Sequence, residues 1–155
     1  MVDAARVRRL LEALREYRQR LAELQKLDAD EYVGAHAYEG RYLVQASAQA
    51  CIGIANHLIS SEGWRVPRDF RDTFTVLEEE QVLDPDLAER LRNLAGLRNR
   101  LVHLYTAVDD TLVHRFLASG IDDFDHFASR VADLAAHEAD DAEKTTGRSG
   151  EEPDT

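Results

Sequence analysis

The feature that most constrains this fold is a set of apolar residues that recur every three or four positions along most of the chain. In the first segment they are Val7, Leu10, Leu11, Leu14, Tyr17, Leu21, Leu24 and Leu27. Steps of three and four place side chains on one face of an α-helix, whereas a half-buried strand alternates at every second residue. We therefore predict a helix over residues 3–27 that buries one face.

The same spacing predicts five further helices and no convincing strand. They cover residues 32–60, 68–79, 85–107, a segment from 109 or 110 to 120, and a segment that starts near residue 122. The loop at 61–67 contains the helix breakers Gly63 and Pro67. Asp84-Pro85 is typical of an N-cap followed by proline at the first helical position. The expected fold is an all-α, up-and-down helical bundle with a short accessory helix.

Charge divides the chain into unequal parts. The net charge is −11, and residues 138–155 hold seven acidic and two basic residues with almost no large apolar side chain. We expect residues 1–137 to form one helical domain and residues 138–155 to be a disordered acidic tail. Residues 87–105 have the opposite balance, because they hold four arginines and one acid. A local positive patch offers a place for a phosphate even in an acidic protein.

Other features of the sequence exclude several classes of site. The single cysteine, Cys51, has apolar neighbours, which favours burial and excludes an internal disulfide. No apolar run approaches the roughly 20 residues of a membrane span, and the N-terminus does not resemble a signal peptide. We therefore expect a cytoplasmic protein with no membrane partner. The inward carboxylates that a di-metal bundle would require are absent, so we expect no metal and no cofactor.

The candidate chemistry lies in residues 97–105, LRNRLVHLY. On an ideal helix Arg98 and Tyr105 form one stripe, and Asn99 and His103 form the next. Histidine can transfer protons near neutral pH, and arginine can bind a phosphate through two hydrogen bonds. Metal-free RNA cleavage needs both functions, because a base must remove the 2′-hydroxyl proton and a cation must bind the phosphate. A solvated helix face with a structural histidine is the alternative interpretation.

The pattern Arg98-Asn99-x-x-x-His103-x-Tyr105 resembles the extended motif of HepT-type toxins in the HEPN superfamily. The resemblance covers about residues 3–135. It implies a HEPN-like bundle and a metal-independent endoribonuclease that cleaves mRNA or tRNA by 2′-hydroxyl attack and leaves a cyclic phosphate. Arg98 and His103 are then the catalytic residues, and Asn99 supports them.

The positive patch also contains Arg92 and Arg100, which we predict to bind the RNA. Arg98 and His103 lie about 140° apart on one ideal helix, which is unfavourable for a single phosphate. This geometry favours two motifs that act together. The family resemblance likewise implies a homodimer with a shared cleft.

A second protein partner follows from the resemblance. HepT-type toxins pair with an MntA-type nucleotidyltransferase antitoxin in a type VII-like toxin–antitoxin system. The tyrosine of the motif, here Tyr105, is expected to accept adenylyl groups from ATP, which would add charge and bulk to the phosphate site. The sequence has no glycine-rich phosphate loop, so the ATP-using enzyme should be a separate protein. The alternative function is a non-catalytic HEPN scaffold or a nucleotide-binding subunit of a nucleotidyltransferase complex.

Overall fold

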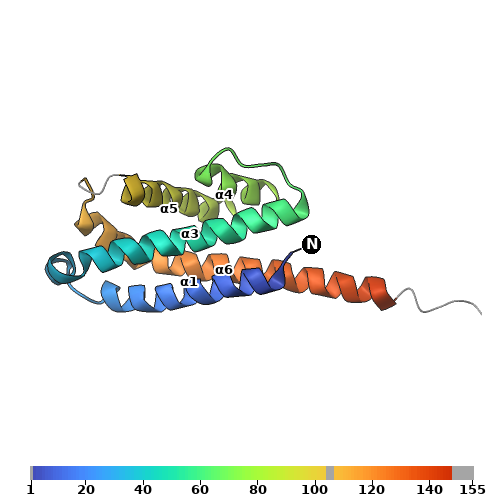
Figure 1. The fold of residues 1–155 in the computed structure, drawn as a ribbon, viewed down its shortest axis with the longest axis horizontal. Helices are drawn as coiled ribbons and strands as arrows, with labels where there is room; N and C mark the ends of the chain where they lie inside the picture. The colour runs from blue at the N-terminus through green and yellow to red at the C-terminus, as the bar shows by residue number, and fades with distance from the viewer. Residues whose placement is uncertain (1, 104–106, 148–155) are drawn as a thin grey trace, which may run out of the picture.

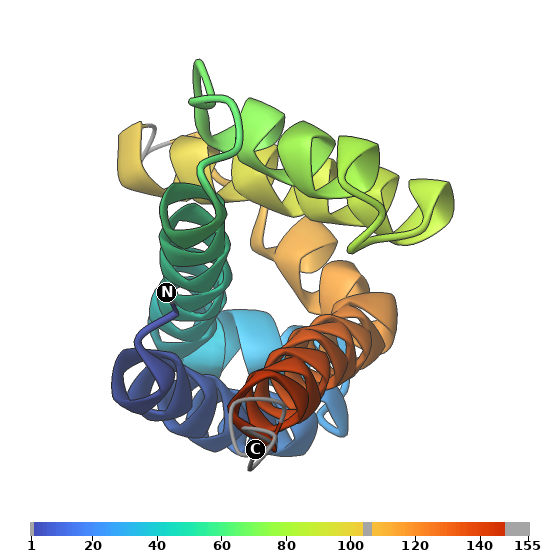
Figure 2. The same ribbon diagram turned by 90° about the vertical axis from the view of Figure 1, so that its right-hand side faces the viewer.

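The computed structural model describes residues 2–103 and 107–147, and these ranges contain helices and no β-strand. The elements are α1 (Ala4–Gln25), α2 (Ala29–Glu31), the π-helical turn η1 (Tyr32–His36), α3 (Ala37–Glu62), α4 (Phe70–Glu79), α5 (Pro85–His103) and α6 (Asp110–Gly147). The long helices α1, α3 and α6 pack against one another, and α4 and α5 lie together across the bundle from α1 (Figures 1 and 2). The predicted all-α bundle with a short accessory helix, α4, is confirmed.

One continuous apolar core joins α1, α3, α5 and α6, and α4 adds Phe74 and Leu77 to it. Cys51 lies in the middle of α3 and is fully buried, as predicted. Burial raises the pKa of its thiol far above the ordinary value, which leaves a small apolar side chain. No helix in the described part of the chain is both long enough and apolar enough to cross a membrane.

Side-chain caps explain where several helices begin. The Asp3 carboxylate accepts a hydrogen bond from the backbone N–H of Arg6 at 3.1 Å, so the helix predicted from residue 3 begins one residue later. Asp84 accepts from the backbone N–H of Leu87 at 2.8 Å, which confirms the predicted N-cap. At the other end of α3, Gly63 adopts a left-handed conformation with φ of 67° and ends the helix.

The second long helix differs from the prediction at its start. Residues 32–36 form the π-helical turn η1, and regular α3 begins only at Ala37. Tyr32 is fully buried, and its ring centre lies 4.8 Å from that of His114 in α6. Its hydroxyl lies against Gly40, in the space that any larger side chain would need. The wider turn therefore accompanies an aromatic anchor between α3 and α6.

The two helices predicted on either side of residue 121 form the single helix α6, so the predicted break at Gly120 was wrong. Gly120 is buried within the helix, and the Phe116 ring occupies the space in which a Cβ atom would lie. The glycine thus allows a close aromatic contact rather than a turn. Asp123, one turn further on, is buried and accepts a hydrogen bond from Arg90 Nε at 2.7 Å.

Helix α6 also extends beyond the expected domain boundary at residue 137. Residues 138–147 were predicted to belong to a disordered tail, but they continue α6 (Figure 1). Half of this segment consists of alanine, glutamate and lysine, which favour helix. The hydroxyls of Thr145 and Thr146 donate to backbone carbonyls one turn earlier. The rest of the expected tail, residues 148–155, lies outside the described residues.

Candidate active site

Arg98, Asn99 and His103 of the candidate motif lie in the last two turns of α5, and Arg98 lies on the buried side of that helix. Leu87, Leu91, Leu94 and Leu101 are buried and recur at steps of four, three and seven. Arg98 stands four residues after Leu94 and three before Leu101, so it occupies the missing position of this apolar stripe. An arginine therefore takes a core-facing place at the end of the bundle.

The surroundings of Arg98 contact its guanidinium, but no carboxylate in the described part of the chain neutralises its charge. The guanidinium carbon lies 4.9 Å from the centre of the Phe70 ring, a cation–π contact, and Nη1 donates to the Asn99 side chain at 3.2 Å. Nε is buried and finds no hydrogen-bond acceptor among the described residues. A buried donor without an acceptor is costly, and an anionic ligand would relieve that cost.

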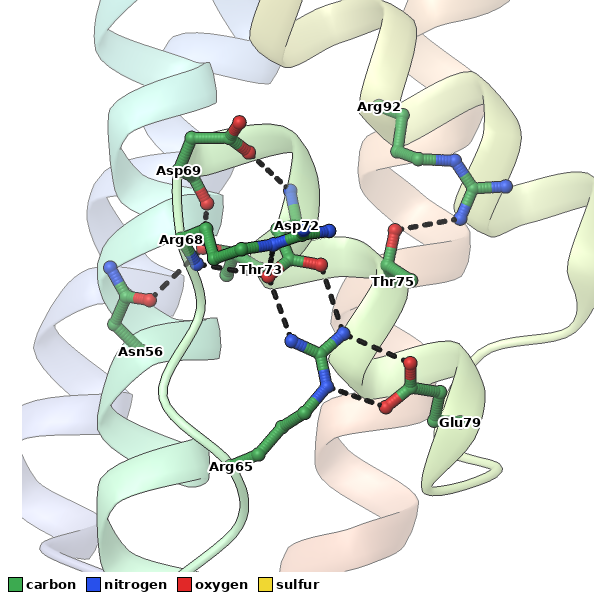
Figure 3. A network of polar contacts seen from close by, with 9 residues as sticks. All are labelled: Asn56, Arg65, Arg68, Asp69, Asp72, Thr73, Thr75, Glu79 and Arg92. Carbon is green, nitrogen blue, oxygen red and sulfur yellow. Dashed lines mark hydrogen bonds and ion pairs between the residues drawn. The ribbon is translucent and has the colours of Figure 1, made fainter.

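Phe70 reaches Arg98 because the first turn of α4 is fixed by a polar network (Figure 3). Asp69 caps α4 and accepts from the backbone N–H of Asp72 at 2.7 Å. The buried Asp72 carboxylate binds the Arg65 guanidinium at 2.8 and 2.9 Å and the backbone N–H of Arg68 at 2.9 Å. Arg65 and the backbone N–H of Arg68 hold the pKa of Asp72 far below its usual value, despite burial. The loop before α4 is therefore tied to the helix by a charged carboxylate.

The other motif residues differ in exposure. Arg100 and His103 are exposed on α5, and neither has a hydrogen-bond or ion-pair partner within the described parts of the chain. Asn99 is half-buried beside Arg98. Tyr105, the expected modification site, lies outside the described residues. Arg98 and Asn99 are thus brought into contact, whereas the imidazole of His103 faces solvent.

Arg92 was predicted to bind RNA, but its guanidinium forms ion pairs with two carboxylates of the same chain. Its guanidinium is 3.2 Å from Glu78 and 3.0 Å from Glu89, and it also donates to Thr75 at 3.4 Å (Figure 3). Such a pair of carboxylates competes with phosphate for the same cation. Arg100 retains an unneutralised charge among the described residues, and it also lines a groove of about 370 Å³ between the end of α5 and the start of α6.

The sequence interpretation missed the contribution of α4. Two residues of α4 pack against the motif helix α5. Phe70 contacts Arg98, and the Arg71 guanidinium lies against Gly96. A glycine in the middle of a helix was the available signal for the second contact, because glycine is rare there without a packing reason. The described residues contain no group of three or more His, Cys, Asp or Glu side chains that could hold a metal ion.

The helical bundle and the arginine–histidine motif at the end of α5 define a domain of the HEPN type. Residues 8–131 match the family described as Ribonuclease HepT-like, and the chain belongs to this family. The resemblance stated from the motif is therefore confirmed.

Two curated relatives carry nuclease names. The mRNA nuclease HepT of Shewanella oneidensis is 32% identical over 84 residues, which cover 54% of this chain and 63% of that protein. The match thus spans less than two thirds of that relative's length. The tRNA nuclease HepT of Aphanizomenon flos-aquae is 27% identical over 124 residues, which cover 78% of this chain and 84% of that protein.

Solved structures share the fold at lower identity. The tri-AMPylated HEPN toxin of Shewanella oneidensis, solved in complex with an MNT antitoxin, has a TM-score of 0.75 and 23% identity, over 85% of this chain and 98% of that chain. The cytosolic protein YutE of Bacillus subtilis, of unknown function, has a TM-score of 0.77 and 19% identity, over 88% and 93% of the two chains. These matches establish the fold.

Proposed function

We propose that this protein is the toxin of a HepT/MntA-type toxin–antitoxin system and acts as a metal-independent endoribonuclease on mRNA or tRNA. The observation that carries the proposal is Arg98, a cation at a core-facing position whose buried Nε has no acceptor among the described residues. A fold alone does not need such a residue, whereas a phosphate-binding site does. Family membership and the names of the two nuclease relatives support the same activity.

The residues suggest the following division of roles. The imidazole of His103 takes the proton of an RNA 2′-hydroxyl, and the 2′-oxygen attacks the adjacent phosphorus. The bond from phosphorus to the 5′-oxygen breaks, and the leaving oxygen takes the proton back from the imidazolium of His103. The products are a 2′,3′-cyclic phosphate and a 5′-hydroxyl. Arg98 binds the phosphate and its developing charge, Asn99 orients Arg98, and Arg100 binds the RNA backbone.

Two copies of the chain would complete this chemistry in a homodimer. Arg98 faces Phe70 and the core, whereas His103 is exposed on a different side of the same helix. A second motif across a dimer interface would supply the missing group to each phosphate. The variants Arg98→Ala and His103→Ala should each be inactive, and a refolded mixture should regain cleavage because each mixed dimer holds one complete site. A mixture without activity would contradict a shared site.

Neutralisation is proposed to occur at Tyr105, by adenylyl transfer from ATP through an MntA-type nucleotidyltransferase. The tyrosine oxygen would form a bond to the α-phosphorus with release of pyrophosphate. Tyr105 follows His103 by two residues, so each added adenylate would bring negative charge beside Arg98 and Arg100. Intact mass after co-expression with the nucleotidyltransferase should increase in adenylate units. Tyr105→Phe should remove the increase and remain toxic.

The decisive experiment measures cleavage of total RNA in the presence of a metal chelator. The wild type should cut, and the new ends should be cyclic phosphates. His103→Ala should lose activity by about 100-fold or more. Arg15→Ala, a surface arginine of α1 across the bundle from α5, should cut like the wild type. Cleavage that survives in His103→Ala would overturn the proposal, and a wild type that binds nucleotide but does not cut would favour the scaffold alternative.

A further inference from the structure

A second arginine contacts the motif helix at a glycine, in the space that a larger side chain would need. Gly96 lies in the middle of α5, and the Arg71 side chain of α4 lies against it. A Cβ atom at residue 96 would stand 2.5 Å from Arg71 Nη2 and 3.2 Å from its Cζ. Glycine is the poorest helix former after proline, so Gly96 lowers the helix propensity of α5. In return, its missing side chain leaves space for the Arg71 guanidinium against the helix backbone, a position called here the seat of Arg71.

Among the residues that the structure describes, no carboxylate pairs with the charge of Arg71. The neighbouring arginines Arg65, Arg68 and Arg92 are all held by acidic side chains. Arg71 is exposed and has no hydrogen-bond or ion-pair partner within the described residues, although this region of the protein supplies carboxylates to the others. Arg100, four residues after Gly96 and so on the same side of α5, is likewise exposed and unpaired within the described residues, which gives this side two cations that the described acids do not neutralise. Such a group suits a polyanion rather than a single acid.

The seat also has a definite place relative to the motif. Gly96 precedes Asn99 by three residues, Arg100 by four and His103 by seven, so all four lie along one side of α5. Seven residues of helix correspond to about 10.5 Å along the axis. An RNA strand whose cleaved phosphate lies at His103 can therefore continue along this side of α5 and place another phosphate near Arg71.

We propose that Arg71, seated on Gly96, binds a backbone phosphate of the RNA that flanks the cleaved one. This inference rests on the proposed ribonuclease function and adds a substrate-binding residue from α4, outside the motif. The contact is to the backbone, so it should strengthen binding of different RNA sequences alike and should not select a base.

The test measures binding of a short, fluorescent 2′-O-methyl oligoribonucleotide of mixed sequence. This probe lacks the 2′-hydroxyl, so wild type can bind it without cleavage. Arg71→Gln should weaken binding by about threefold to tenfold. It should also reduce the slope of log affinity against log salt by about 0.7, the value for one phosphate contact on a single strand. Arg15→Gln, which removes the same charge from α1, should leave both quantities unchanged.

Gly96→Ala provides a second variant that preserves the charge. Alanine favours the helix, and only the flexible end of Arg71 has to move, so the fold should persist. We expect the same loss of affinity as in Arg71→Gln, and no further loss in the double variant. Unchanged binding by Arg71→Gln, or additive losses in the double variant, would overturn the inference. Cleavage of unmodified RNA by the wild type is measured in parallel, and its absence would instead reject the ribonuclease proposal.

Discussion

The guanidinium of Arg98 lies over the ring of Phe70, with 4.9 Å between the guanidinium carbon and the ring centre. The two residues come from α5 and from the first turn of α4, and the contact is made at a core-facing position of α5. Arg98 thus takes the place of an apolar residue in the stripe that ends with Leu101. An arginine at this position is expected to lower the stability of the fold compared with an apolar residue. Such a loss is common where function requires a buried charge.

Replacement of Arg98 by leucine should separate stability from function. Leucine would complete the apolar stripe and remove a buried N–H that has no acceptor among the described residues, so the free energy of unfolding should rise by about 1 kcal/mol. RNA cleavage should be lost. Chemical denaturation and the cleavage assay measure the two effects, and Arg100→Leu, at an exposed position, should bring no gain in stability. A clear loss of stability in Arg98→Leu would contradict a core-facing arginine.

Asp72→Asn should loosen the start of α4, which carries Phe70 and Arg71. The charged form of Asp72 accepts hydrogen bonds from Arg65 and from the Arg68 backbone, so the amide variant should lower the free energy of unfolding by about 1–2 kcal/mol. The pKa of Asp72 is lowered in the folded state, so its contribution is present above the ordinary aspartate pKa and is lost as the pH falls well below it. Denaturation at neutral and acidic pH should show the difference shrinking in acid.

The matched control for Asp72→Asn is Asp125→Asn. Asp125 also binds an arginine, Arg18, through two oxygens, but both side chains are more than a third exposed. A surface pair of this kind contributes little, so its loss should hardly change stability. Equal effects of the two substitutions would show that burial of Asp72 is not what makes its pair stabilising.

Tyr32 and Gly40 form a tight pair in the turn that begins α3. Gly40→Ala should lower the free energy of unfolding by about 1–3 kcal/mol, because the new methyl group would overlap the Tyr32 hydroxyl. Tyr32→Phe should be neutral or slightly stabilising, since that hydroxyl is buried without a partner among the described residues. Denaturation of the double variant should show partial relief of the Gly40→Ala defect. Strict additivity would mean that the hydroxyl is not the obstacle.

Glu138 should make stability decrease as the pH rises. It borders an apolar groove of about 630 Å³ between α1 and α6, and a hydrogen bond with Glu62, together with burial, raises its pKa to about 7. The folded protein therefore keeps a proton that the unfolded chain releases near pH 4.5. This stabilisation is complete below the unfolded pKa and is lost as the pH rises through about 7.

Glu138→Gln should remove this pH dependence. The amide can donate to Glu62 at any pH, so the variant should melt at a higher temperature than the wild type near pH 8, with the difference vanishing near pH 5. Melting curves at several pH values test this, with Glu143→Gln, at an exposed position of the same helix, as the control. A difference that does not change with pH would contradict the shared proton.

The sequence was sufficient for those features that depend on residues close together in the chain. The spacing of Leu14, Leu21 and Leu24 predicts the buried face of α1, and Asp84-Pro85 predicts the start of α5. The motif from Arg98 to Tyr105 led to the HepT family, since its residues lie within eight positions of the sequence. In each case helix geometry relates residues three or four apart directly.

Only the tertiary structure decided which helices pack together and which residues come into contact. Gly120 has the sequence properties of a helix end, but the Phe116 ring covers it and α6 continues. Nothing local to Phe70 or Arg71 indicates that they contact Arg98 and Gly96, because those contacts depend on how α4 packs across α5. Helix periodicity specifies which face of a helix is apolar, whereas the neighbour of that face is selected by the packing of the whole core. The sequence by itself therefore determined the helices and the motif, and the packing determined which residues surround Arg98.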